Sequence, residues 1–133
     1  MKLAAFRTLH DPHTPAVGRV SADLASIEPF DVPPALAALG VLPLIEALAR
    51  GDSLPPVRAA LALGTVNLTA PLPRPRRNIF CVGKNYYAHA KEFAGSGFDS
   101  SAKAGGDIPS VPIIFSKVPE SVIGPGDAIE IPT

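Results

Sequence analysis

The sequence predicts an α+β fold, and three observations lead to that class. Short β-prone segments bounded by turn residues occur near both ends of the chain, while residues 34–50 carry apolar side chains at helical spacing. The 16 prolines are about twice the usual share, which excludes a continuous helical bundle. The 133 residues are also enough to bury a core.

The first part of the chain, residues 1–72, is predicted to form a small α/β module. Residues 2–8 and 17–24 are expected to form two strands, because both are apolar and β-prone. The connector between them, HDPHTPAVG, is rich in turn-forming residues. We therefore expect a hairpin or meander at the start of the module.

Helices are predicted to follow these strands. Over residues 34–50 the apolar side chains recur at steps of three, with Gly40 and Pro43 expected to split the helix and Gly51 to end it. A further helix is predicted from about Pro55 to Leu63, with Ser53 as a possible N-cap and Gly64 after it.

The second part of the chain, residues 73–133, is predicted to be mainly β. Alternating prolines make APLPRPRR extended and stiff, so we place the boundary near residue 72. NIFCV is a continuous apolar run, which is typical of a strand buried on both faces. A helix over NYYAHAKEFA, a Gly/Ser-rich loop, and two strands in VPIIFSKV and DAIEIP are expected to follow, the strands joined through the turn GPGD.

Charge and cysteine content limit the function classes. Twelve basic and twelve acidic side chains cancel without any run of one sign, which argues against a nucleic-acid or anionic-membrane partner. Cys81 is the only cysteine, which suits a reducing compartment, and it is expected to be buried and structural. No signal peptide or membrane span is recognisable, so we expect a cytoplasmic protein.

Two short motifs carry little chemistry. His10 and His13 form H-x-x-H, but the prolines around them make the segment a connector, and two solvated histidines are the simpler interpretation. Gly83-Lys84 lacks both the earlier glycine and the following Ser or Thr of a phosphate-binding loop. Gly83 is expected instead to allow a sharp turn after the strand.

His89 and Glu92 are the best candidates for chemistry. Residues three apart share a helix face, so the carboxylate can orient the imidazole and the imidazole can take a proton from water. An ordinary helix-face pair is the competing interpretation. Lys117 is the other open case: alternation places it on the face of Ile113 and Phe115, where it needs an anionic partner unless the strand ends there and the lysine reaches water.

The surrounding residues resemble the fumarylacetoacetate hydrolase superfamily. PRPRRNIFCVGKNYYAHAKE and then PIIFSKVPESVIGPGDAIEIP follow the family pattern V-G-x-N-Y, H-x-x-E, F-x-K and G-P-G-D in order over residues 71–133. Residues 1–70 are more weakly similar to the N-terminal module of bacterial members. The resemblance implies a β-roll or sandwich core, and a homodimer.

The resemblance also implies a reaction and a site. Members cleave, isomerise or decarboxylate small oxo acids with Mg²⁺ or Mn²⁺ as a Lewis acid. In the hydrolases the H-x-x-E pair, here His89 and Glu92, activates water under a lid, for which residues 95–106 are suited. Lys117, Lys84 and Tyr86 are expected to contact the substrate, although a solvent-exposed lysine is the simpler interpretation of Lys84.

One feature departs from the family pattern. The metal ligands of the family, an E-x-E pair and a later acidic residue, are expected downstream of Thr133, and Glu130 does not replace them. We therefore expect the 133 residues to be an N-terminal portion, inactive by itself, with unpaired edges on its last strands.

Two classes of function remain open at this stage. The leading hypothesis is a metal-dependent hydrolase that cleaves C–C bonds of acylpyruvate-like or fumarylacetoacetate-like dioxo acids. An isomerase or decarboxylase of 2-hydroxymuconate-type dicarboxylates in aromatic catabolism is the alternative within the enzyme class. A non-catalytic module that has kept the fold is the alternative outside it.

Overall fold

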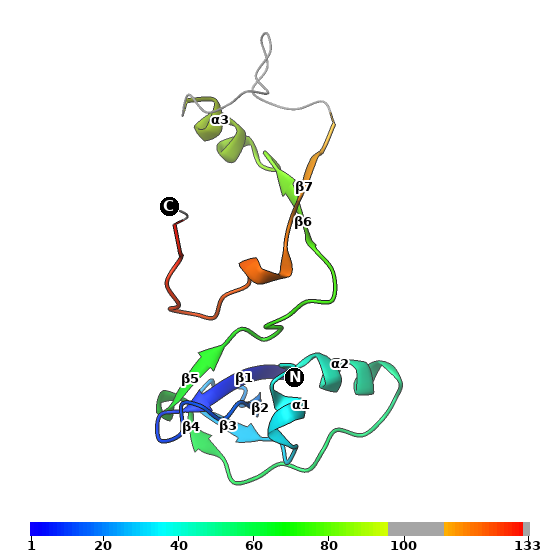
Figure 1. Cartoon of the computed structure of the whole chain (residues 1–133), viewed down its shortest axis with the longest axis vertical. Helices are drawn as coiled ribbons and strands as arrows, with labels where there is room; N and C mark the ends of the chain where they lie inside the picture. Colours follow the sequence, from blue (N-terminus) through cyan, green and yellow to red (C-terminus); the bar gives the residue numbers. More distant parts are fainter. Residues whose placement is uncertain (96–110, 132–133) are drawn as a thin grey trace. The chain divides into compact units, whose positions relative to one another are not determined.

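The computed structural model of the chain describes residues 1–95 and 111–131. These residues form two compact units, which are considered separately. The first unit comprises Met1–Pro75 with Pro119–Thr133, and the second unit comprises Arg76–Val118. Helices and antiparallel strands are mixed along the chain (Figure 1), in agreement with the predicted α+β class. A separate module ending near residue 72 stays a prediction.

A five-stranded antiparallel sheet forms the centre of the first unit. Its strands, in spatial order, are β4 (Leu61–Ala62), β3 (Ser26–Pro29), β2 (Ala16–Val20), β1 (Lys2–Thr8) and β5 (Val66–Thr69). The predicted hairpin is confirmed, because β1 pairs with β2 from Lys2 opposite Val20 to Phe6 opposite Ala16. β2 ends four residues earlier than expected, because residues 21–25 turn the chain into β3, a strand that the sequence did not reveal.

The sheet is curled so that its two edges approach each other. β4 and β5 lie at opposite edges, yet only the 3-10 turn η1 (Leu63–Thr65) connects them. Four Cα steps from Ala62 to Val66 span at most about 14 Å, so the edges cannot be further apart than that. The backbone N–H of Leu63 donates to the carbonyl of Ala25 at 2.9 Å, which extends the pairing of β3 and β4 into this turn.

The curl encloses one of two apolar clusters. Phe6, Ile27 and Val66 are buried together on its inner side. Gly18 lies on the same strand surface, where an added Cβ would be 2.7 Å from the carbonyl oxygen of Glu28, so only glycine allows this close approach. The second cluster combines Ala5, Val17 and Phe30 with helix residues. Those helix residues are Ala37, Val41 and Leu44.

Two short helices flank the sheet. α1 (Pro34–Ala37) and α2 (Leu42–Ala49) are separated at Gly40, as predicted, and Gly40 has φ +70°. Pro43 does not break a helix but lies in the first turn of α2, where its missing N–H costs nothing. Gly51 follows α2 with φ +81°, which confirms it as the stop.

The helix predicted over residues 55–63 is wrong, since the chain is extended there. Val57 bridges to Phe30, and the N–H of Arg58 donates to the carbonyl of Pro29 at 2.7 Å. The carbonyl of Pro56 accepts from the N–H of Asp31 at 2.8 Å. Backbone groups that a helix would use internally are thus taken by the end of β3, and the consecutive prolines at 55 and 56 favour the extended form.

The second unit is built from three elements. β6 (Ile79–Gly83) and β7 (Ile113–Lys117) form a two-stranded antiparallel sheet, and α3 (Tyr87–Gly95) follows β6 (Figure 1). All three were predicted. The expected burial of β6 on both faces is wrong for the described residues, because Phe80 is 76% exposed and Val82 is 50% exposed. Within residues 1–95 and 111–131, neither strand has a second neighbour to cover it.

A turn and an irregular segment end the described chain. After the 3-10 turn η2 (Pro119–Ser121), the N–H of Asp127 donates to the carbonyl of Gly124 at 3.2 Å, with Pro125 between them and Gly126 at φ +83°. This is the type II geometry expected from G-P-G-D. The strand predicted in residues 127–132 is not present up to Ile131, because no described strand offers it a hydrogen-bonding partner.

Candidate functional site

Helix α3 places His89 and Glu92 on its exposed side. At about 100° per residue the two side chains lie about 60° apart around the helix, so they project in similar directions one turn apart. Both residues are exposed. Ala90, between them in sequence, is only 1% exposed and marks the packed side of α3. The imidazole lies about 100° and the carboxylate about 160° from that packed side.

This arrangement permits general-base chemistry. A neutral imidazole can accept a proton, and a carboxylate one turn away can hold its other ring N–H in place. Because both side chains face outward, a substrate can reach them. The structure therefore agrees with the geometry that the H-x-x-E spacing predicted, while the catalytic role itself stays a prediction.

Lys84 and Tyr86 lie between β6 and α3. Lys84 is half-buried and has φ +49°, whereas Gly83 does not have a positive φ. The sharp turn that the sequence assigned to Gly83 is thus made by Lys84. Tyr86 is 71% exposed, and its carbonyl accepts the N–H of Ala90 at 2.9 Å, which starts the hydrogen bonding of α3.

Lys117 lies at the other end of the two-stranded sheet. In the register of β6 and β7, Ile79 is opposite Lys117 and Gly83 is opposite Ile113. Four residues of strand separate the two ends by about 13 Å, so Lys117 starts far from the residues that follow Gly83. Lys117 is exposed, so of the two alternatives for this lysine the structure supports the one in which it reaches water.

The other candidates do not form a site. Cys81 is a free thiol of intermediate exposure, less buried than expected. His10 and His13 lie in the exposed connector between β1 and β2, where the carboxylate of Asp11 accepts the N–H groups of His13 and Thr14. Among residues 1–95 and 111–131, no three His, Cys, Asp or Glu side chains come close enough to hold a metal ion. The Gly-rich lid predicted over 95–106 lies almost entirely outside the described residues.

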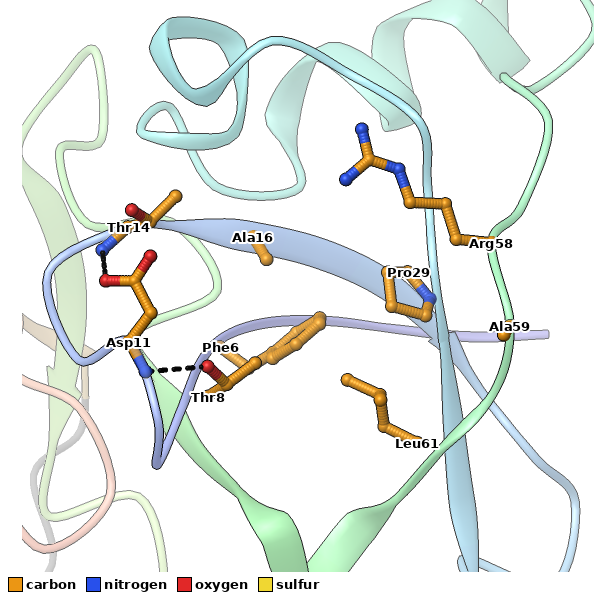
Figure 2. Close-up of a pocket in the computed structure, with 9 residues that line it drawn as sticks. All are labelled: Phe6, Thr8, Asp11, Thr14, Ala16, Pro29, Arg58, Ala59 and Leu61. Atoms are coloured by element: carbon orange, nitrogen blue, oxygen red, sulfur yellow. Dashed lines mark hydrogen bonds between the residues drawn. The ribbon is translucent and has the colours of Figure 1, made fainter.

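The first unit has a pocket at one end of the curled sheet (Figure 2). Its cavity volume is about 320 Å³, and its wall contains the inward-facing side chains of Phe6, Ala16 and Leu61. Its two charged residues already have partners: Asp11 accepts two backbone N–H groups, and Arg58 pairs with Asp31. These backbone hydrogen bonds, and above all the Thr14 side chain, lower the pKa of Asp11. Both charged groups of the pocket are thus held by neighbouring residues, and we assign no catalytic role to it.

Comparison with known proteins identifies the second half of the chain. Residues 78–133 match the family described as fumarylacetoacetate (FAA) hydrolase, C-terminal. This segment belongs to the fumarylacetoacetate hydrolase superfamily. The match begins one residue before β6 and contains every candidate residue of α3 and β7, so the resemblance read from the motifs is confirmed.

Curated relatives in this superfamily carry one activity in their names. The chain is 41% identical over 69 residues to oxaloacetate tautomerase YisK of Bacillus subtilis, and this covers 52% of the chain and 20% of that protein. It is 31% identical over 142 aligned positions to the mitochondrial oxaloacetate tautomerase Fahd2a of Rattus norvegicus, covering 99% of the chain and 40% of that protein. The chain thus spans less than half the length of these relatives.

Two features of the superfamily segment escaped the sequence analysis. The positive φ of Lys84 had no signal in the sequence, because a neighbouring glycine was the more plausible residue for the turn. The burial of Ala90 could have been found, since it is the small residue between the two polar ones on α3.

Of the helices within residues 1–95 and 111–131, none has the length and apolar character needed to cross a membrane.

Proposed function

We propose that the protein is a superfamily enzyme that interconverts the keto and enol forms of a small 2-oxo dicarboxylate such as oxaloacetate. The observation that supports it most directly is the His89–Glu92 pair on the exposed side of α3, in a segment that matches the superfamily. The names of the relatives favour tautomerisation, which is closer to the isomerase alternative than to the hydrolase predicted first.

The proposed reaction requires the His89–Glu92 pair to accept one proton from the substrate and to return one proton to it. The His89 imidazole takes a proton from the carbon next to the oxo group; the electron pair of that C–H bond forms a C=C bond, and the π electrons of the C=O bond move to the oxo oxygen. Return of a proton to this oxygen gives the enol, so no atom is gained or lost. Glu92 keeps the imidazole oriented for both steps, a role that general acid–base catalysis requires of a neighbouring carboxylate.

Cationic and hydroxyl groups would bind the two substrate carboxylates. We assign these contacts to Lys117 and Tyr86, which are both part of the family pattern. Because Lys117 begins about 13 Å along the strand from the Gly83 end of the sheet, one dicarboxylate could bridge it to His89 only if its long side chain reaches toward α3. A homodimer and a cytoplasmic location belong to the same proposal.

A divalent cation belongs to the proposal through the superfamily alone. Mg²⁺ or Mn²⁺ would polarise the oxo group as a Lewis acid. The residues that the structure describes do not fit such an ion, since they bring no three possible ligands together. The proton transfer above is therefore argued only for residues of this chain, and the expectation of ligands beyond Thr133 stays part of the proposal.

Hydrolysis is the second candidate, favoured by the description of the matching family. In that reaction the same imidazole would take its proton from water rather than from carbon, and a C–C bond of a 2,4-dioxo acid would break. The two candidates share the base and differ in what it deprotonates.

The test uses the complete protein with oxaloacetate and with short 2,4-dioxo acids. Enol decay is followed by ultraviolet absorbance, and C–C cleavage is followed by product analysis, each with and without Mg²⁺ or a chelator. We expect tautomerisation that depends on the cation, and a fall in kcat of about 10²- to 10⁴-fold in His89→Ala.

The matched control for this substitution is His10→Ala, the same change at an exposed histidine of the first unit. It should leave kcat within error of the parent protein. Equal activity of His89→Ala and the parent would remove the base from the proposal. Cleavage without tautomerisation would replace the proposed reaction by the hydrolase, and turnover of none of these acids would favour the non-catalytic alternative.

A further inference from the structure

The link between β6 and α3 contains a residue in an unfavourable backbone conformation. In the part of the chain that the structure describes, Lys84 and Leu24 are the two non-glycine residues with positive φ, at +49° and +61°. A side chain with a Cβ is disfavoured in this region, and lysine is not one of the residue types, such as asparagine, that adopt it readily. The conformation therefore persists because the surrounding structure imposes it.

Lys84 is placed where its backbone decides the direction of the catalytic helix. β6 ends at Gly83, and α3 begins at Tyr87, so three residues reverse the chain from strand to helix. The left-handed residue supplies this change of direction. Ala90 then fixes the rotation of α3 about its own axis, since its side chain is only 1% exposed. Direction and rotation together determine where His89 and Glu92 project.

We infer that Lys84 is a positioning residue that orients the His89–Glu92 helix through its left-handed backbone, more than through its ammonium group. The inference rests on the proposed role of His89 and goes beyond it, because it assigns the function of Lys84 to the main chain. A lysine that only contacted a substrate carboxylate would need no positive φ. Lys84→Gly should then be the least disruptive change, and a β-branched residue the most disruptive.

Four substitutions that each remove the positive charge of Lys84 distinguish a role of its backbone from a role of its side chain. Lys84→Gly and Lys84→Asn accept a left-handed backbone, Lys84→Ala tolerates it about as well as lysine, and Lys84→Val opposes it. If the backbone matters, kcat should decrease in the order Gly and Asn, then Ala, then Val. We expect Lys84→Val to be about 5- to 30-fold below Lys84→Ala, with KM changed much less.

The side-chain role predicts a different pattern. All four variants would lose activity to the same extent, mainly through KM, and Lys84→Arg alone would rescue it. That result would overturn the inference. Leu24→Val is the control for a general loss of stability. It places a β-branched residue at the other left-handed position, which lies outside the second unit. Leu24→Val should lower the melting temperature without changing kcat per folded molecule.

A second readout does not depend on activity. Hydrogen exchange of the α3 amides in the complete protein should be faster in Lys84→Val than in Lys84→Ala, because an altered turn loosens the start of the helix. Equal exchange in the two variants would contradict the inference even if the kinetic order were found. If the parent protein turns over no oxo acid, the proposed function fails, and the exchange comparison still decides the role of Lys84.

Discussion

The two units of the chain bury their apolar side chains to very different extents. Within residues 1–92 and 111–131 eleven apolar residues are buried; ten of these belong to the first unit, and Ala90 belongs to the second. The strands of the second unit instead expose several large apolar side chains. These include Ile79, Phe80, Val82, Ile114 and Phe115.

The buried core and the proposed catalytic residues therefore lie in different units. The first unit has a curled sheet with an apolar cluster on each face, which is what an independent core requires. The second unit carries every residue that we propose for catalysis, on one helix and two strands with little packing of their own. Within the described residues, the candidate catalytic groups thus lie on elements that bury few apolar side chains.

The largest effect is expected from the same truncation in both units. Phe6→Ala removes a side chain that is 1% exposed, and it should lower the free energy of unfolding by about 3–5 kcal/mol. Phe80→Ala removes one that is 76% exposed, and it should cost less than about 1 kcal/mol. Urea unfolding of the two variants measures both. Equal costs would mean that Phe80 is buried in the complete protein, and the contrast between the units would then disappear.

A smaller effect is expected from two glycines that flank helix α2. Gly40 and Gly51 both have positive φ, but an added Cβ would be 2.2 Å from the carbonyl oxygen of Pro71 at Gly40 and would meet nothing within 4 Å at Gly51. Gly51→Ala should cost about 1–2 kcal/mol for the backbone conformation alone. Gly40→Ala should cost about 1–3 kcal/mol more, because it also disturbs the packed connection to Pro71. Thermal unfolding compares the two, and equal costs would show that this connection is loose.

The smallest expected effect concerns acid stability of the first unit. The Ser21 hydroxyl donates to the Asp23 carboxylate at 2.6 Å and, with the N–H of Ala25, lowers the pKa of Asp23. A carboxylate with a lowered folded-state pKa stabilises the protein above its unfolded pKa, and this contribution is lost as pH falls through the folded value. Between about pH 5 and pH 2, the melting temperature of the parent protein should therefore fall slightly more than that of Asp23→Asn. Parallel pH profiles would contradict this account.

Local patterns predicted much of the fold. Turn chemistry and periodicity act over a few neighbouring residues, and they were enough to predict six features. These are the hairpin of β1 and β2, the division of the helices at Gly40, the elements β6, α3 and β7, and the type II turn at Gly126. The failures have one cause. Residues 55–63 have helical composition but bond to the end of β3, and residues 127–131 have strand composition without a described partner. In both cases a contact distant in sequence decides the outcome.

The candidate site divides in the same way. By itself the sequence determined which residues are the candidates for the chemistry, because the spacing of His89 and Glu92 and the family pattern around them depend only on residue order. The tertiary structure alone decided that Ala90 turns this pair outward, that Lys84 rather than Gly83 makes the turn, and that Lys117 lies at the far end of the strand pair. The physical reason is that backbone strain, burial and strand register are set by the packing of the whole unit, and no short stretch of sequence contains that information.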